Sequence, residues 1–506
     1  MSHLPEPGSG ESGSGGEEET RRNATRHMRE DLLRYLPSQV IPALIAFVTI
    51  PIITRLLSPA EYGDYRLVLA AVAAFGAAGG WLPAAVYRFF PAMELSGELE
   101  QLRATLRWLL AFTLGLFATV WLAGTGILSS TLGTGQAEIF LIGGILMLVN
   151  TVWGVVNAEV RTIREVTWYS TSVVLNKALT LGIGVGLVVW GGLRVDGLLL
   201  GSIVASLILL PMLLAVINRR LPRAGAFSRS LARQMWQYGL PIVLVQLLDW
   251  ALQLSDRFFI AGLRNQTEVG LYSAAYGIAE QGMGTIVLMF ELPFSILGAR
   301  VWERGGSAAA AGFVSDSARS YLLVAIPAWA GLSILAQPII EVMTSAPYHE
   351  AAVIMPVVAL ALLIGAIQWW YTAGAIFSKK TGQTLISMAA AVSVNIGLNL
   401  VFIERYGYPA AAVTSLVGYV VGLGVMVWLS RRDFRWAFPF RSLGRALVAT
   451  GVMSAAMWAL AMLVELGPLT TLLVSVPLGI VVYGAALLAV GEPQARTLLD
   501  RITRRA

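Results

Sequence analysis

Residues 35–65 read YLPSQVIPALIAFVTIPIITRLLSPAEYGDY, and residues 238–272 read YGLPIVLVQLLDWALQLSDRFFIAGLRNQTEVGLY. Each segment has a tyrosine and a proline at its start, an arginine (Arg55 or Arg257) further along, and then a Gly-x-Tyr turn (beginning at Gly63 or Gly270). A signature that recurs after roughly 205 residues indicates an internal duplication. Transporters are often built from two related helical halves around a central cavity, so the repeat predicts such a pair.

The composition places the chain in a membrane. Of its 506 residues, 56% are hydrophobic and 13% are charged, and the mean hydropathy is +0.70. These values leave too few polar side chains to cover a soluble globule of this length, so we expect an all-α integral membrane protein.

Apolar runs of about 20 residues are long enough to span a bilayer, and about fourteen of them follow one another along the sequence. We expect six spans in a first half, six in a second half and an appended pair: 36–57, 66–88, 107–128, 138–160, 167–190, 195–217; 238–262, 271–298, 320–342, 351–376, 383–403, 409–430; 444–465, 468–490.

The basic residues test this count, because Lys and Arg accumulate in cytoplasmic loops. Most of the 36 basic residues fall on one side of the membrane when fourteen spans are assumed, in segments 21–34, 219–233, 379–380, 431–445 and 496–505. The alternate loops are nearly free of Lys and Arg. We therefore expect a multi-pass protein of the inner or plasma membrane, with both termini cytoplasmic.

Several functional classes are excluded by what the sequence lacks. It contains no Cys and three His, and neither an HExxH pattern nor a GxxxxGK[ST] phosphate loop, so a metal enzyme or an ATPase with that motif is not expected. The basic loops explain the pI of 9.6 without nucleic-acid binding. The outer loops are too short for a catalytic domain. We expect no cofactor, no metal and no enzymatic activity.

Charged side chains within a span need a partner or a water-filled cavity. In the seventh span, Asp249, Gln253 and Asp256 recur at spacings of four and three, which predicts one polar helix face. Asp249 lies near the middle of the membrane. It is either a cavity carboxylate or part of an Asp–Arg pair or interhelical hydrogen bond. Glu280 and Glu291 share a face of the eighth span, and Asn395 and Asn399 form an amide pair that typically joins helices.

Basic groups are placed in the first, second, fifth and seventh spans. Lys177 is a ligand-binding group or a lysine that extends to the interface, and Arg55, Arg66 and Arg88 are ligand-binding groups or interfacial anchors. Several separated cations favour a multivalent anion such as a diphosphate. Our substrate-binding candidates are Lys177, Arg257, Arg88, Arg66 and Arg55, and our candidates for ion or proton coupling are Asp249, Asp256 and Glu280.

A family resemblance extends from about residue 32 to 490. The motifs YGLP (238–241), DRFFI (256–260) and VGLY (269–272) resemble the second-half signature of polysaccharide transporters, the oligosaccharide-lipid flippases of the MOP superfamily. Residues 51–63, PIITRLLSPAEYG, are similar to the opening helix and turn of that family. Asn395 and Asn399, followed by YGYPAA (406–411), resemble its eleventh helix and the next turn.

The resemblance implies two pseudo-symmetric six-helix lobes plus a C-terminal pair, working by alternating access. Its usual cargo is an oligosaccharide on a polyprenyl diphosphate, moved to the outer leaflet for cell-surface polysaccharide assembly. Cationic groups would hold the diphosphate or acidic sugars, and an H⁺ or Na⁺ gradient would drive the cycle in a monomer. The corresponding domains are a tail (1–31), an N-lobe (32–218), a linker (219–237), a C-lobe (238–430), the helix pair (431–490) and a second tail (491–506).

Three other functions remain open. A multidrug exporter of the same superfamily usually has twelve helices, so the pair at 444–490 argues against it. A lipid II flippase shares the fourteen-helix plan, but its first-helix pattern is not found here. A membrane glycan polymerase or ligase is an enzyme that needs a larger outer loop.

Overall fold

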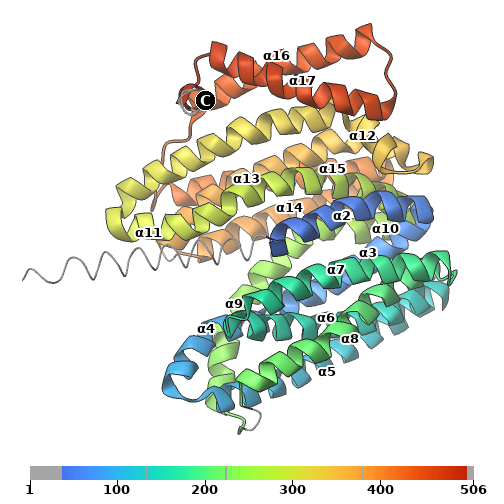
Figure 1. Ribbon diagram of the computed structural model, residues 1–506, viewed down its shortest axis with the longest axis vertical. Coiled ribbons are helices and arrows are strands. Elements are labelled where there is room, and N and C mark those ends of the chain that lie inside the picture. Colours follow the sequence, from blue (N-terminus) through green and yellow to red (C-terminus); the bar gives the residue numbers. More distant parts are fainter. Residues whose placement is uncertain (1–36, 133, 223–224, 379, 498–506) are drawn as a thin grey trace, which may run out of the picture.

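The computed structural model describes residues 37–132, 134–222, 225–378 and 380–497. The predicted tail 1–31 and most of the tail 491–506 lie outside these residues. The described chain is almost wholly helical and contains no strand, which confirms the all-α class. Two helical bundles lie side by side, and a pair of helices covers one of them (Figure 1).

The first bundle is the N-lobe. It comprises seven helices that form six spans, since α3 and α4 meet end to end at Gly80: α2 (Pro37–Leu56), α3 (Pro59–Gly79), α4 (Trp81–Ser96), α5 (Leu99–Leu132), α6 (Thr134–Thr162), α7 (Val166–Val189) and α8 (Arg194–Arg220).

The second bundle, the C-lobe, is entered by α9 (Arg229–Leu254), and the C-terminal pair follows it. Its other elements are α10 (Asp256–Leu263), α11 (Gln266–Ile334), α12 (Ala336–Met343), the 3₁₀ helix η1 (Ala346–Ile354), α13 (Met355–Phe377), α14 (Gly382–Tyr406) and α15 (Tyr408–Ser430), and the pair is α16 (Phe440–Leu463) and α17 (Pro468–Ala489).

The number of spans agrees with the sequence. Within the described residues, ten helical segments are long and apolar enough to cross a membrane, and the bent pairs at α9–α10 and at the end of α11 with α12 bring this to twelve. The shorter apolar helix Ile41–Leu56 and the first arm of α11 complete the fourteen that the sequence predicts. The 69-residue α11 is two arms, because Gly306 has φ 65° and ψ −163°. Glycine adopts this left-handed backbone without strain, and the chain turns back there (Figure 1).

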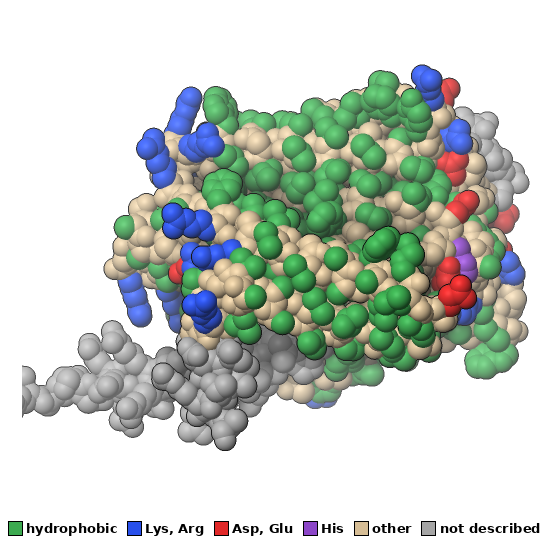
Figure 2. Space-filling view, turned by 90° about the horizontal axis from the view of Figure 1, so that it is seen from above, with side chains coloured by type: hydrophobic (Ala, Val, Ile, Leu, Met, Phe, Trp, Pro, Cys, Tyr) green, Lys and Arg blue, Asp and Glu red, His purple; other side chains and the backbone are tan. Residues whose placement is uncertain are grey.

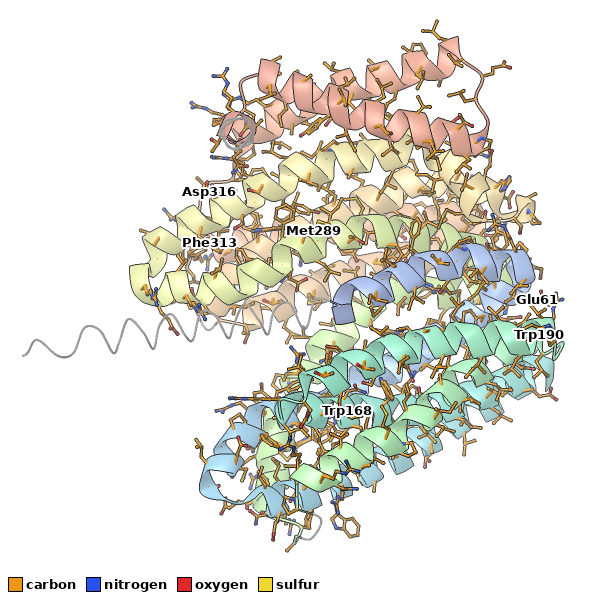
Figure 3. All side chains as sticks on the ribbon, in the orientation of Figure 1. Glu61, Trp168, Trp190, Met289, Phe313 and Asp316 are labelled. Atoms are coloured by element: carbon orange, nitrogen blue, oxygen red, sulfur yellow. The ribbon has the colours of Figure 1, made fainter. Side chains whose placement is uncertain are left out.

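The two lobes touch at the ends of their helices, near residues 56–59, 264–266 and 343–346, which we call the closed end. The hydroxyl of Ser345 donates to the carbonyl oxygen of Thr54 at 2.7 Å, and the hydroxyl of Tyr348 donates to that of Leu57 at 3.0 Å. In Figure 3, Glu61 and Trp190 lie at this end, and Phe313 and Asp316 lie at the opposite one.

The repeated glycines form the tightest contact of the closed end. A Cβ atom on Gly63 of α3 would lie 2.0 Å from the carbonyl oxygen of Gln266 in α11, and one on Gly270 of α11 would lie 1.9 Å from that of Pro59 in α3. The two contacts are reciprocal, since each glycine packs against the first turn of the helix from the other lobe. The duplicated motif therefore has a packing function that only glycine fulfils.

Each of these helices also has an acidic residue in its first turn that bonds to the start of another helix. Glu61 forms a capping box with Ser58, and its carboxylate accepts two hydrogen bonds from Arg194 at the start of α8. In the C-lobe, Asn265 caps α11, and Glu268 accepts the backbone N–H of Tyr408 at the start of α15. The same position in each copy thus joins the lobe's second span to its sixth.

Helix α9 contacts both lobes. Near its start, Trp236 packs against Trp81 of α4 in a T-shaped contact with centroids 5.3 Å apart, and Gly239 fits against the same tryptophan. The indole N–H of Trp250 donates to the Ala70 carbonyl of α3 at 2.8 Å. Leu252, nearer its end, is buried with residues of α13, α14 and α15. Helix α9 begins at Arg229. Its first turns therefore occupy part of the segment 219–237, which we expected from the sequence to be a linker.

The helix pair α16–α17 packs on the second arm of α11. The hydroxyl of Tyr483 donates to the Leu323 carbonyl at 2.7 Å. The segment leading into α16 is held by Asp433, whose carboxylate pairs with Lys380 and accepts a hydrogen bond from Gln383. These bonds keep the pKa of Asp433 below its usual value, so the ion pair persists at neutral pH and is lost only when acid protonates the carboxylate.

Charge divides between the two ends of the molecule. On the face seen in Figure 2, most Lys and Arg side chains gather at the end opposite the closed end, whereas the closed end carries Asp, Glu and His side chains together with a smaller number of basic ones. The first of these, which we call the basic end, carries residues 221–222 and 225–228, the loops 380–381 and 431–439, and the turn at Gly306. This asymmetry matches the loop charges counted in the sequence.

We expect Gly270→Ala to weaken the closed end, because its Cβ would meet a backbone oxygen that cannot rotate away. Overpacking of this kind costs about 1–3 kcal/mol, so the thermal unfolding temperature of the detergent-purified protein should fall. Gly76→Ala is the matched control, since no heavy atom lies within 4 Å of its added Cβ. Equal unfolding temperatures for the two variants would contradict the role of the glycine contact.

Candidate functional site

Two adjoining cavities lie where the lobes meet, on the basic-end side of the glycine contact. The smaller has a volume of about 180 Å³ and is lined by α2, α3, α7, α8 and α11. The larger has a volume of about 510 Å³ and is lined by α2, α9, α11, α13 and α15. Glu280 and Gln281 of α11 line both. The two cavities together form a candidate binding site shared by both lobes.

The smaller space, the cationic cavity, contains two of the predicted substrate-binding residues, Arg66 and Lys177. The Nε atom of Arg66 is buried without a hydrogen-bond partner. Within the described part of the chain, Lys177 has neither a hydrogen bond nor an ion pair. Glu280, the carboxylate of this lining, acts electrostatically on Arg66, so one acidic group faces two basic ones. Burying an unpaired cation is costly, and the cavity is therefore suited to an anion.

The larger space, the acidic cavity, is lined by carboxylates and amides. Asp249 and Gln253 come from α9, and Glu280, Gln281 and Glu291 come from the first arm of α11. Trp369 of α13 and Tyr419 of α15 complete the polar wall. The predicted coupling residues Asp249 and Glu280 are thus brought together in one cavity by two consecutive spans, α9 and the first arm of α11.

The predicted polar face of the seventh span is wrong at its third member. Asp249 and Gln253 share a face of α9, but this helix ends at Leu254 and the chain bends by 47° into α10. The bend removes Asp256 from the line of the other two, and Asp256 does not line either cavity. Helical spacing cannot foresee such a break, since every residue around Ser255 is compatible with a helix.

Asp256 is fully buried among hydrogen-bond donors of the C-lobe. Its carboxylate accepts from the hydroxyl of Tyr272 at 2.7 Å, the amide of Asn399 at 2.6 Å and the hydroxyl of Ser415 at 2.6 Å. Asn399 also donates to Asn395 at 3.2 Å. The amide pair predicted to join helices is therefore confirmed, and Asp256 is the group that links α10, α11, α14 and α15.

Arg257, another predicted substrate-binding residue, is also fully buried. Its Nη1 donates to the carbonyl oxygen of Gln253 at 2.9 Å, and its guanidinium lies over the rings of Tyr272 and Tyr276, with centroid distances of 5.6 and 5.0 Å. Nε and Nη2 are buried without partners. In this conformation, Arg257 is therefore enclosed by protein and does not line the cavities.

Arg55 and Arg88 lie apart from the cavities as well. Arg55, at the closed end, donates to the Pro51 carbonyl at 2.9 Å and to the Val342 carbonyl of α12 at 2.8 Å, so it links α2 to the other lobe. Arg88 is exposed on α4. The correspondence of Arg55 with Arg257 in the repeat is also wrong, because one is an exposed contact at a helix end and the other is buried after a bend.

Sequence reasoning missed several contributors to the site. No sequence pattern marks Trp369 and Tyr419 as site residues, because isolated aromatic residues are common in membrane helices. The first-turn acidic residues Glu61 and Glu268, in contrast, stand in a pattern that the sequence shows. Each stands three residues after a Ser or Asn that precedes a helix, which is a recognised helix-start pattern, and each stands two residues before a repeated glycine. No cluster of three or more His, Asp or Glu side chains suited to a metal occurs within residues that the structure describes.

Comparisons with known proteins agree with this architecture. Solved structures with the same fold include a lipid II flippase MurJ in an inward closed conformation, with a TM-score of 0.72 and 15% identity over 92% of this chain and 100% of that chain. They also include multidrug resistance MATE family transporters of the MOP superfamily. An inward-facing one has a TM-score of 0.61 and 15% identity, covering 78% of this chain and 97% of that chain. An outward-facing one has a TM-score of 0.57 and 13% identity, covering 79% and 93%.

No significant match was found among curated protein sequences. At identities this low, the structural likenesses establish the fold alone. The family is established by sequence, because the profile of the polysaccharide biosynthesis protein family matches residues 29–293, more than half of the chain. This match shows that the chain belongs to the family of polysaccharide biosynthesis proteins.

Proposed function

We propose that the protein is a flippase that moves an oligosaccharide linked to a polyprenyl diphosphate from the cytoplasmic to the outer leaflet. The observation that carries this proposal is the cationic cavity between the lobes, where Arg66 and Lys177 stand together and the buried Nε of Arg66 has no hydrogen-bond partner. Each charge within the membrane costs about 2.5 kcal/mol or more. A diphosphate held by both groups would offset that cost through charge-assisted hydrogen bonds.

The two-lobe arrangement supports alternating access. The lobes are packed at the closed end by backbone contacts at Gly63 and Gly270, and the cavities lie on the far side of these contacts. Rocking of the lobes would open the closed end and expose the same cavities to the other side. The protein would then carry its cargo without chemical change and would act as a transporter, not an enzyme. We take the working unit to be a monomer.

The proposed orientation places the basic end in the cytoplasm. Positive charge is retained on the cytoplasmic side of the inner or plasma membrane, and the loops of the basic end carry most of it. The cavities would therefore face the leaflet in which lipid-linked glycans are made, with both termini on the same side.

The absence of Cys from the sequence allows a direct test of orientation. We expect Glu350→Cys, at the closed end, to react with an impermeant maleimide in right-side-out vesicles, and Arg219→Cys, at the basic end, to react only after the vesicles are opened. The reverse pattern, measured by mass shift on gels, would contradict the proposed direction of transport.

Purified protein in liposomes should accelerate the transbilayer movement of a polyprenyl-diphosphate disaccharide. Arg66→Gln and Lys177→Gln should each slow this movement at least about tenfold, the loss expected for one charge-assisted hydrogen bond. Arg405→Gln is the matched control, because Arg405 stacks on Tyr406 away from the cavities. The rate is measured as oxidation of the sugar by external periodate. Variants as fast as the control would argue against a diphosphate in the cationic cavity.

An H⁺ or Na⁺ gradient is proposed to drive the cycle through Asp249, Glu280 and Asp256. The first two line the cavity and can exchange ions with it. Asp256 is held by three donors, so a change in its charge or ion occupancy would alter the contacts of α10, α14 and α15 together.

Two substitutions of Asp256 separate its role in stability from its proposed role in ion coupling. Asp256→Ala removes a buried acceptor from three donors, of which Asn399 keeps its bond to Asn395, and should destabilise the protein by about 3 kcal/mol. Asp256→Asn keeps most of the volume and should fold, but it should lose the acceleration of transport by a Na⁺ or H⁺ gradient. Thermal unfolding and transport with and without a gradient are the measurements. If a gradient still accelerated transport by Asp256→Asn, Asp256 would have a structural role in joining helices and no role in coupling.

A second candidate is export of organic cations, and the acidic cavity favours it. Carboxylates beside Trp369 and Tyr419 resemble a site for a hydrophobic cation. Transport of an organic cation by the same liposomes, with no movement of the lipid-linked disaccharide, would select this function over the first.

A further inference from the structure

The acidic cavity is lined by acidic side chains and by no described basic ones. Its described lining includes Asp249, Glu280 and Glu291 but no Lys, Arg or His. None of the three carboxylates has an ion pair within 4.0 Å to a described Lys or Arg. Glu280 also lies within electrostatic range of Arg66 in the adjoining cavity, whereas Asp249 and Glu291 line only the acidic cavity. The lining therefore presents carboxylates, without a basic side chain among them, to whatever enters the cavity.

We propose that the glycan carried by this protein consists of neutral or amino sugars and excludes uronic and other acidic sugars, because its saccharide occupies the acidic cavity while its diphosphate occupies the cationic cavity. This inference rests on the proposed flippase function and adds the class of cargo. It departs from our expectation from sequence, in which the cationic groups served either a diphosphate or acidic sugars.

The lining of the acidic cavity suits sugar hydroxyl groups. Ionised carboxylates accept hydrogen bonds, and amides both accept and donate them. Gln253 and Gln281 supply the amides, and the faces of Trp369 and Tyr419 supply apolar surface. The volume of about 510 Å³ falls within the range of ligand sites, about 300–1,000 Å³. An amino sugar gains a further attraction, because its ammonium group can pair with a carboxylate.

The cationic cavity fixes the orientation of the cargo. The unpartnered, buried Nε of Arg66 and the unpartnered Lys177 are independent evidence that an anion belongs beside the acidic cavity. The two cavities share Glu280 and Gln281, so a diphosphate held by α3 and α7 would place its first sugar against α9, α11 and α13. A uronate there would face three carboxylates, and like charges in a poorly solvated space repel strongly.

The test compares three cargoes that share one polyprenyl diphosphate and differ in the terminal sugar of a disaccharide: N-acetylglucosamine, glucosamine or glucuronate. The full-length protein is reconstituted in liposomes, and the rate of crossing is measured by external periodate. We expect the neutral and amino disaccharides to cross at least about tenfold faster than the glucuronate disaccharide, as like-charge repulsion in the cavity requires. Equal rates, or faster movement of the glucuronate cargo, would overturn the inference and leave the flippase function standing.

A charge-neutral variant links the selectivity to the cavity. Asp249→Asn combined with Glu291→Gln should reduce the preference for the neutral over the glucuronate cargo at least about fivefold. Glu404→Gln is the matched control, since Glu404 is an exposed carboxylate near the closed end of α14 that lines neither cavity. An unchanged preference in the double variant would overturn the assignment of the sugar to this cavity. If none of the three cargoes crosses while the protein unfolds at its normal temperature, the flippase function fails, and the inference fails with it.

Discussion

The backbone contact between α3 and α11 is the constraint on which the rest of the molecule depends. At Gly63 and Gly270 the two helices approach until a side chain on either would overlap a carbonyl oxygen of the other. The helix starts involved are held by Glu61 and Glu268, which reach the sixth span of their own lobes. The second and sixth spans of each lobe are thus both fixed to the small area where the lobes meet. Because the lobes are joined at this end, a cavity can lie between them further along.

The charges within the membrane are arranged in two ways. Asp256 and Arg257 are enclosed, the carboxylate by three donors and the guanidinium by two tyrosine rings. Arg66, Lys177, Asp249 and Glu280 instead line cavities. Hydrogen-bond donors replace water around Asp256, and tyrosine rings and one carbonyl oxygen do so around Arg257, whereas the second group depends on water or cargo. The difference separates residues that hold the lobes together from residues available to a ligand.

Much of the fold and part of the candidate site could be predicted from the sequence. Apolar length and loop charge gave the fourteen spans, and charge within a span pointed to Arg66, Lys177, Asp249 and Glu280. The prediction failed where a helix bends, since the break at Ser255 moved Asp256 off its expected face. It also failed where equivalence in the repeat was judged by residue type, as for Arg55 and Arg257. The pairing of distant helices that puts Trp369 and Tyr419 beside Asp249 is a tertiary property, and no local pattern encodes it.

Helix α9 is fixed to one lobe through Trp236, Gly239 and Trp250 and to the other through Leu252. Two bodies joined by a shared beam cannot separate freely, since any rotation between them must be absorbed along that beam. The two nearest attachments stand only two residues apart in the chain, since Trp250 bonds to α3 and Leu252 packs against α13, α14 and α15. A rotation of one lobe against the other would therefore have to break or shift one of these contacts. Asp249, which lines the acidic cavity, is next to Trp250, so the position of its carboxylate is coupled to the relative position of the lobes.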